Sequence, residues 1–213
     1  MSMVEVNVPD IGDFKEVEVI EVLVKPGQEE GILKGLYLLQ EGGKESKHRV
    51  QLMGSGTILR EVIAASELLR NDWGIESDVW SAPSFNLLAR DGADVERWNM
   101  LHPSEPARLS HLAQCLAPTS GPIVVSTDYM KVFAEQVRAY VPKGRSYKVL
   151  GTDGFGRSDS RAKLREFFEV NRYYVVVAAL KSLADEGVLS SGVVTQAIEK
   201  YGINPNKPNP VTV

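Results

Sequence analysis

The sequence predicts an α/β fold in which a mostly parallel sheet of about five strands lies between two layers of helices. From His48 onward, short apolar segments with the period of a strand alternate with longer segments whose apolar residues recur at helical spacing. Such alternation is typical of a parallel sheet with helices on both faces. The 213 residues, of which 43% are hydrophobic and 24% charged, suit one globular domain with an appendage.

The residues before His48 follow a different pattern. Residues 4–8 and 17–22 alternate apolar and polar side chains, as half-buried strands do. Two strands are too few to bury a core by themselves. A glycine-rich extended connector follows, with residues 33–39 as the candidate for an edge strand. The expected parts of the chain are therefore a short β segment over 1–28, a connector over 29–47 and an α/β domain over 48–213.

Within the α/β domain, the elements follow one another in regular order. Apolar runs bounded by turn residues predict strands at 50–53, 77–81, 122–127 and 147–151. Helical spacing predicts helices at 58–69, from 85 onward, and at 109–116, 129–140, 173–185 and 193–201, with one more that ends at 168. The crossovers between the strands are expected to be right-handed.

Short polar residues mark where two of these helices should begin. Asp128 is expected to cap the helix over 129–140, and Ser158 or Asp159 the helix that ends at Phe168. A side-chain oxygen at such a position accepts a hydrogen bond from one of the first N–H groups of the helix.

Polar loops follow each predicted strand, at residues 54–57, 81–84, 127–128 and 151–158. Ligands of parallel sheets usually bind at the carboxyl ends of the strands. If the chain has a function of its own, we expect it at these loops.

The first loop, Gly54-Ser55-Gly56-Thr57, leads from a strand into a helix. Its N–H groups can hold a phosphate, because small residues let an anion approach the positive end of the helix dipole. It is an incomplete dinucleotide fingerprint, since Leu59 stands where a third glycine belongs. A tight strand-to-helix turn explains the same residues, and we favour that interpretation.

The densest polar loop covers residues 151–161, with three glycines, three hydroxyl side chains and two arginines. The arginines suit bidentate binding of a carboxylate or a phosphate. They can also pair with Asp153, with Asp159 or with a partner subunit, and we favour this structural role. The candidate anion-binding residues of the two loops are Gly54, Ser55, Gly56, Thr57, Thr152, Gly154, Gly156, Arg157, Ser158 and Arg161.

We identify no catalytic and no metal-ligating residues in the sequence. Cys115 lies in an apolar stretch and is expected to be a small buried hydrophobic residue. His48, His102 and His111 lack the spacing of a metal pair, so each is expected to be a surface or locally hydrogen-bonded ring. The GxSxG motif of serine hydrolases is absent.

Charge and hydropathy exclude several classes of partner. The net charge is −4 and the basic residues form no dense run, so we expect no nucleic-acid partner. No apolar stretch approaches 18 residues, so we expect no membrane partner. One cysteine and the lack of a signal peptide predict a cytoplasmic protein.

Several of these segments carry a family resemblance. They are GSGTILR at 54–60, SDVWS at 77–81, ARDG at 89–92, ERWNMLHP at 96–103, STDYMK at 126–131, AEQVR at 134–138 and GTDGFGRSDSR at 151–161. Together they resemble the C-terminal domain of homodimeric pyruvate dehydrogenase, the thiamine-diphosphate component of the pyruvate dehydrogenase complex. The resemblance extends from about Glu30 to Val213.

The resemblance implies a transketolase-like C-terminal domain that acts as a scaffold and contributes to a homodimer. The family decarboxylates pyruvate and acetylates lipoyl groups, with thiamine diphosphate and magnesium held mainly by two other domains. Their Gly-Asp-Gly and Asn-Asn motif is missing here. We therefore expect no catalytic residue and no cofactor in this chain alone. The implied partners are other domains or subunits of pyruvate dehydrogenase and the acetyltransferase component.

An alternative stays open on the residues themselves. The chain can be an anion- or nucleotide-binding α/β module that uses the loops at Gly54 and Gly151.

The first 28 residues resemble a different domain. VNVPDIG at 6–12 and VLVKPG at 22–27 are similar to the opening of a lipoyl domain of the acetyltransferase component. The hairpin that carries the lipoylated lysine does not follow, and Lys25 precedes a Pro-Gly turn. We therefore expect no lipoylation, and the chain resembles a junction of two partial genes or an engineered chimera.

Overall fold

The computed structural model describes residues 28–44, 46 and 48–213, so the two strands expected over 4–8 and 17–22 lie outside the described residues. In chain order the helices and strands are α1 (Glu29–Lys34), β1 (Tyr37–Gln40), β2 (Arg49–Gly54), η1 (Gly56–Ile58), α2 (Leu59–Trp73), β3 (Glu76–Ser81), α3 (Phe85–Leu101), α4 (His111–Leu116), β4 (Ile123–Ser126), α5 (Lys131–Glu135), η2 (Arg138–Tyr140), β5 (Tyr147–Leu150), α6 (Arg161–Phe167), α7 (Arg172–Asp185) and α8 (Ser191–Lys200). The two elements labelled η are single 3₁₀ turns.

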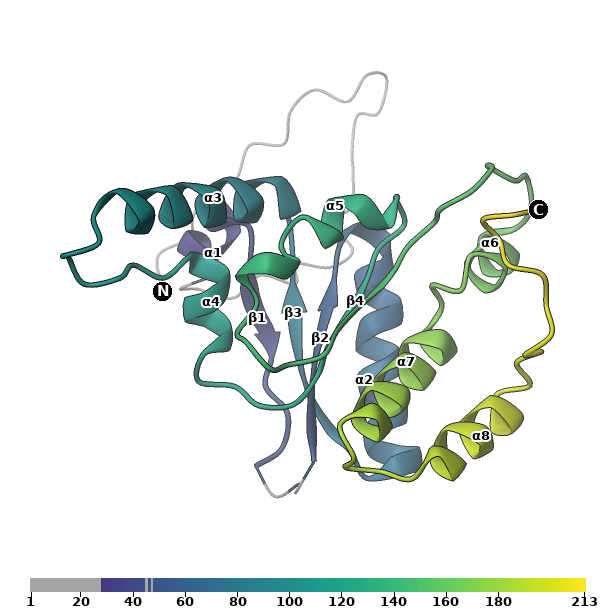
Figure 1. Cartoon of the computed structure of the whole chain (residues 1–213). Helices are drawn as coiled ribbons and strands as arrows, with labels where there is room; N and C mark the ends of the chain where they lie inside the picture. The colour runs from purple at the N-terminus through teal and green to yellow at the C-terminus, as the bar shows by residue number, and fades with distance from the viewer. Residues whose placement is uncertain (1–27, 45, 47) are drawn as a thin grey trace, which may run out of the picture.

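The strands form one five-stranded sheet in the order β1-β3-β2-β4-β5 (Figure 1). The four strands β2 to β5 are parallel, and β1 pairs with β3 in the antiparallel direction at one edge. The predicted α/β class with a mostly parallel sheet of about five strands is therefore confirmed. The chain moves from β2 to β3 on one side and then to β4 on the other side of β2, so the strand order reverses between β2 and β4.

Alternate residues of each central strand face the two helical layers. Leu52 and Val79 belong to a core shared with α2, α7 and α8, whereas the next residues, Met53 and Trp80, belong to a core shared with α3 and α4. Figure 1 shows these two groups of helices on opposite sides of the sheet. The period of two in the strands thus produces the three predicted layers. Among the described residues, none of the helices combines the length and the apolar character that spanning a bilayer requires.

The segment before β2 differs in part from the expected extended connector. Its edge strand is present as β1, but Glu29–Lys34 form helix α1. Two glutamates in its first turn and Lys34 in its last turn favour the helix dipole, and Lys34 pairs with Glu30 at 2.6 Å. Gly35 then ends the helix in the left-handed conformation (φ +90°).

Two expected helix starts are wrong. The stretch predicted as one helix over 129–140 divides into α5 and η2, and it starts after Met130 without a side-chain cap. Asp128 does not cap it, because the Thr57 hydroxyl donates to its carboxylate and Thr152 fixes its carbonyl.

The cap of α6 is Ser160 rather than Ser158 or Asp159. The Ser160 hydroxyl accepts from the N–H of Lys163, and Asp159 instead accepts from the N–H of Ser160.

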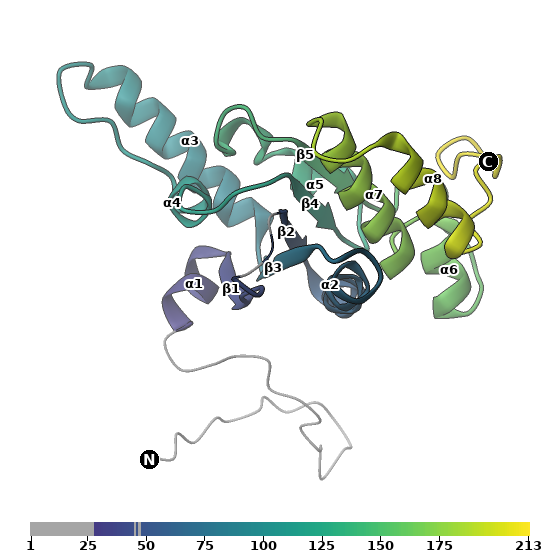
Figure 2. The ribbon, with the colours of Figure 1, turned by 90° about the horizontal axis from the view of Figure 1, so that it is seen from below.

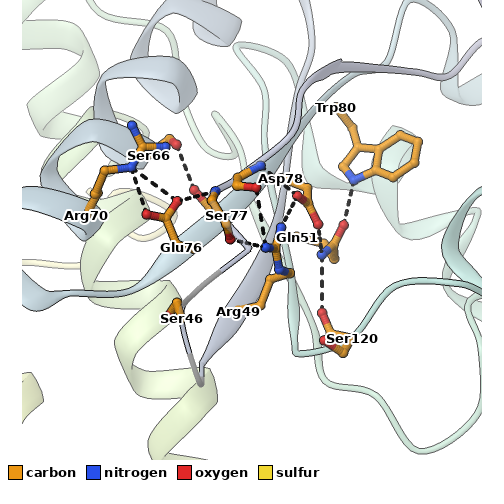
Figure 3. A network of polar contacts seen from close by, with 12 residues as sticks. Ser46, Arg49, Gln51, Ser66, Arg70, Glu76, Ser77, Asp78, Trp80 and Ser120 are labelled. Atoms are coloured by element: carbon orange, nitrogen blue, oxygen red, sulfur yellow. Dashed lines mark hydrogen bonds and ion pairs between the residues drawn. The ribbon is translucent and has the colours of Figure 1, made fainter.

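A buried polar network closes the amino-terminal end of the sheet (Figure 3). Gln51 is fully buried, and its amide group donates to Asp78 at 2.7 Å and accepts from the Trp80 indole at 2.7 Å. Asp78 also accepts from the N–H of Gly42 and pairs with Arg49. Each of these side chains has a partner, whereas Nη2 of Arg145, buried at the same end of the sheet, has none among the described residues.

The packing of α3 gives a first prediction. Gly92 lies in this helix beneath the ring of Tyr140, and an added Cβ would lie 2.2 Å from a ring carbon. Gly92→Ala is therefore expected to lower the free energy of unfolding by about 1–2 kcal/mol, although alanine ordinarily favours a helix. Urea unfolding followed by circular dichroism measures the change.

Gly192→Ala in α8 is the matched control, since a Cβ there meets only the Ser190 hydroxyl, at 3.6 Å. This change should stabilise the protein by up to about 1 kcal/mol. Equal stabilisation by both substitutions would contradict the described packing of Tyr140.

Candidate functional site

A cleft of about 480 Å³ opens at the carboxyl ends of the strands, next to the point where the strand order reverses between β2 and β4. Crevices at this point of a parallel sheet are the usual ligand sites. The cleft is lined by Thr57, Ile58, Asp128, Thr152, Gly154, Gly156, Arg157, Asp159, Arg161, Leu164, Arg165, Phe168 and Val170.

The structure brings the two predicted anion loops together in this cleft. Thr57 comes from the first loop, and Thr152, Gly154, Gly156, Arg157 and Arg161 come from the second. Three candidates lie elsewhere: Gly54 and Ser55 are buried below the cleft, and Ser158 faces a separate hollow. Gly56 lines an adjoining hollow of about 360 Å³ together with Arg60, Arg161 and Arg165.

Packing accounts for two of the candidate glycines. A Cβ at Gly54 would lie 2.7 Å from the Cα of Leu59, so glycine lets α2 approach the sheet. Gly154 has a φ of +104°, and a Cβ there would lie 2.4 Å from the carbonyl oxygen of Pro210. The tight strand-to-helix turn favoured for the first loop is thus observed at Gly54.

Asp128 organises the centre of the cleft. The Thr57 hydroxyl donates to its Oδ2 at 2.9 Å, and the Thr152 hydroxyl donates to its carbonyl oxygen at 2.8 Å. It therefore ties the ends of β2, β4 and β5 together. From local sequence, Asp128 is predicted at a strand end and as a helix cap. Its actual partners, Thr57 and Thr152, are 71 and 24 residues away, so local sequence does not reveal them.

The two loop arginines are not paired with the aspartates proposed for them. The Asp153 carboxylate accepts from the N–H of Lys131 at 3.0 Å and lies 3.7 Å from its Nζ. The guanidinium of Arg157 lies 5.1 Å from the ring centroid of Phe167. Arg161 is exposed and has no acidic partner within the described part of the chain.

A buried ion-pair network forms the wall behind the cleft. The carboxylate of Glu61 on α2, only 7% exposed, accepts from Arg165 Nη1 at 2.8 Å and from Arg172 Nε at 2.9 Å. The backbone N–H of Arg172 donates to it as well, at 3.0 Å. Burial raises the pKa of Glu61, but the hydrogen bonds from Arg172 and the charges of both arginines outweigh burial and hold the pKa below its ordinary value.

The remaining titratable groups form no catalytic arrangement in the described residues. His111 Nε2 lies 2.9 Å from the carbonyl oxygen of Leu36, 75 residues away, and the ring also contacts the Cys115 thiol four residues along the chain. His102 does bond locally, to the carbonyl of Trp98. Cys115 is half-buried and 3.6 Å from His111 Nε2, but burial raises the pKa of the thiol, which disfavours a nucleophilic thiolate.

No group of three or more histidine, cysteine, aspartate or glutamate side chains in the described residues is arranged to hold a metal ion.

Comparison with known proteins gives consistent matches. Residues 35–171 match the family model described as the transketolase-like TK C-terminal domain. The chain is 60% identical over 192 residues to the pyruvate dehydrogenase E1 component of Pseudomonas aeruginosa, a match that covers 90% of this chain and 22% of that protein. It is 58% identical over 186 residues to the same component of Escherichia coli K12, with 86% and 20% covered.

The chain thus spans about a fifth of the length of the curated relatives that it matches. Among solved structures, it is similar to transketolase from Leishmania mexicana, with a TM-score of 0.49, 19% identity, and coverage of 73% of this chain and 19% of that one.

The Glu61 network gives a second prediction. Glu61→Gln keeps the shape but leaves the half-buried Arg165 and the more exposed Arg172 without a carboxylate, so the free energy of unfolding at pH 7 should fall by about 2 kcal/mol. Glu96→Gln, an exposed change on α3, should alter it by less than about 0.5 kcal/mol. Urea titration measures both.

The effect of Glu61→Gln should also depend on pH. Because the folded state lowers the pKa of Glu61, its stabilisation is present above the ordinary pKa and is lost as pH falls through the folded value. The stability of the two proteins should therefore begin to converge as the pH falls below the ordinary pKa of glutamate, about 4.3, and converge fully only below the lower pKa of the folded state. A difference that persists unchanged at acidic pH would show that the carboxylate charge is not its cause.

Proposed function

The chain belongs to the transketolase-like TK C-terminal domain family, and from this membership we propose that it serves as the assembly domain of a pyruvate dehydrogenase of the E1 type. The observation that carries the proposal is 60% identity across 90% of the chain to a protein of which the chain spans only 22%. Most of such an enzyme therefore lies outside the matched segment. In this proposal the chain completes a subunit that decarboxylates pyruvate and acetylates lipoyl groups.

The residues of this chain do not fit thiamine diphosphate and its magnesium ion. The Asp153 carboxylate, in the one Asp-Gly pair of the second loop, is engaged by Lys131. No paired asparagines follow this loop in the sequence, and no acidic cluster for a metal ion exists in the described residues. Catalysis in this proposal depends on other domains, and no step is assigned to this chain.

A surface suited to assembly lies at the far end of α3. Met100, Leu101 and Leu109 are 69%, 51% and 56% exposed. The side chain of Asn99 bonds both backbone groups of Arg108, at 2.8 and 3.0 Å, and so holds Leu109 beside the helix end. Figure 2 shows α3 and the following loop extending away from the sheet. Neighbouring exposed apolar side chains of this size are typical of interfaces.

We assign this surface to contact with the remainder of a longer E1-type protein, and dimerisation to the enzyme so assembled. The acetyltransferase component is then a partner of the whole enzyme in the cytoplasm.

Two further features remain proposals. One is the division of the chain into 1–28, 29–47 and 48–213. The other is the derivation of residues 1–28 from a truncated lipoyl domain that carries no lipoyl group. Intact-mass measurement of the protein from a lipoylating host tests the second, since one lipoyl group would add a defined mass.

The assembly role gives a third prediction. The chain alone, supplied with pyruvate, thiamine diphosphate, magnesium and an electron acceptor, should show no decarboxylation. When it is mixed with the P. aeruginosa E1 component shortened by its matching C-terminal fifth, the two should co-elute and activity should be restored. Decarboxylation of pyruvate by the chain alone that persists after contaminating pyruvate dehydrogenase complex is removed would contradict the proposal.

The helix-end surface is tested in the same assay. Combined Met100→Asp and Leu101→Asp should weaken the affinity for the shortened E1 component at least about tenfold, because charge replaces apolar contact. Co-elution and restored activity should fall accordingly. Val188→Asp, at an exposed site between α7 and α8, is the matched control and should have no effect. All three positions are exposed, so thermal unfolding of each variant should match the parent protein.

A further inference from the structure

The cleft at the carboxyl ends of β2 and β4 has features that the assembly role does not use. Arg157, Arg161 and Arg165 line it together with Asp128 and Asp159, and Arg165 is paired with Glu61. The chain as a whole has a net charge of −4. Arginines without an acidic partner among the described residues favour an anion at this one place in an acidic protein.

The arginines of the cleft differ in what they already bind. Arg165 is paired with Glu61, whose carboxylate offsets its charge. Arg157 faces the Phe167 ring, a contact that uses the plane of a guanidinium and leaves its N–H edge for hydrogen bonds. Arg161 has no acidic partner in the described part of the chain. Two guanidinium groups that line one cleft suit a doubly charged phosphate better than a single carboxylate.

The remainder of the cleft is apolar. Ile58, Leu164, Phe168 and Val170 line it. Its volume of about 480 Å³ lies within the range of small-molecule sites, in which apolar walls bind the body of a ligand and a few polar groups orient it. Inorganic phosphate alone would leave this apolar surface uncovered.

We propose that this cleft binds a small organic phosphate, with the phosphate group held by Arg157 and Arg161 and the organic body against Leu164 and Phe168. Binding of this kind is separate from the assembly role and does not require it.

Substitution of Asp128 provides a test in which ligand binding should become tighter rather than weaker. Its carboxylate lines the same cleft and accepts the hydroxyl hydrogen of Thr57. The charge repels an anion, and the hydrogen bond keeps the Thr57 hydroxyl from donating to a ligand. Asp128→Asn removes the charge, and its amide can donate to Thr57 and so release that hydroxyl for a phosphate. This substitution should therefore tighten binding.

The experiment is calorimetric titration of the full chain with phenyl phosphate at constant ionic strength, with inorganic phosphate and benzoate as comparison ligands. Saturable one-to-one binding of phenyl phosphate, tighter than that of either comparison ligand, is expected. Combined Arg157→Gln and Arg161→Gln should weaken it by about tenfold or more. Asp128→Asn should strengthen it about threefold.

Arg97→Gln, an exposed change on α3, is the control and should leave binding unchanged. The substituted side chains are all exposed, and unfolding temperatures without ligand establish that each variant is folded. Absence of saturable binding, or equal binding by the double arginine variant, would overturn the proposal. If benzoate binds as tightly as phenyl phosphate, the assignment of a phosphate group is overturned. If inorganic phosphate binds as tightly as phenyl phosphate, the role of the apolar wall is overturned.

Discussion

The cleft depends on one buried interaction, the carboxylate of Glu61 between Arg165 and Arg172. It joins three helices at one point: α2 follows the first loop, α6 follows the second, and α7, which also packs on α2 through the apolar core, begins with Arg172. A buried carboxylate is costly unless charged hydrogen-bond partners surround it. The ion pair with Arg165 links α6 to α2, and α6 carries Arg161, Leu164 and Arg165 into the cleft.

The polar groups at the two ends of the sheet differ in how deeply they are buried. At the amino ends, Gln51, Asp78 and Trp80 bond one another inside a closed network (Figure 3). At the carboxyl ends, the second loop is exposed and Arg161 has no acidic partner among the described residues. A buried polar network contributes to specifying one fold, whereas exposed guanidinium groups beside apolar walls can still bind a ligand. The contrast explains why the strand ends that the topology favours are also the chemically available ones.

The sequence was sufficient for elements that local pattern determines. The strands at 50–53 and 122–127 stood out as apolar runs bounded by turn residues, and the alternation with helices gave the fold class. Local sequence pattern was not sufficient where the contacts of a residue are made with residues far away in the chain. Asp128 looks like a helix cap until Thr57 is placed beside it, and the partners of Glu61 are 104 and 111 residues away. The loops at 54–57 and 151–161 were found as candidates, but only the fold shows which members line one cleft.

Family membership and the cleft bear on different parts of the molecule. The match to the transketolase-like TK C-terminal domain covers residues 35–171, which contain the whole sheet and helices α2 to α6. A shared fold does not by itself assign a ligand, since function resides in particular side chains. Figures 1 and 2 place the exposed end of α3 and helix α6 on opposite sides of the sheet. The end of α3 and the arginine cleft are therefore separate surfaces, so substitutions at one can be tested without altering the other.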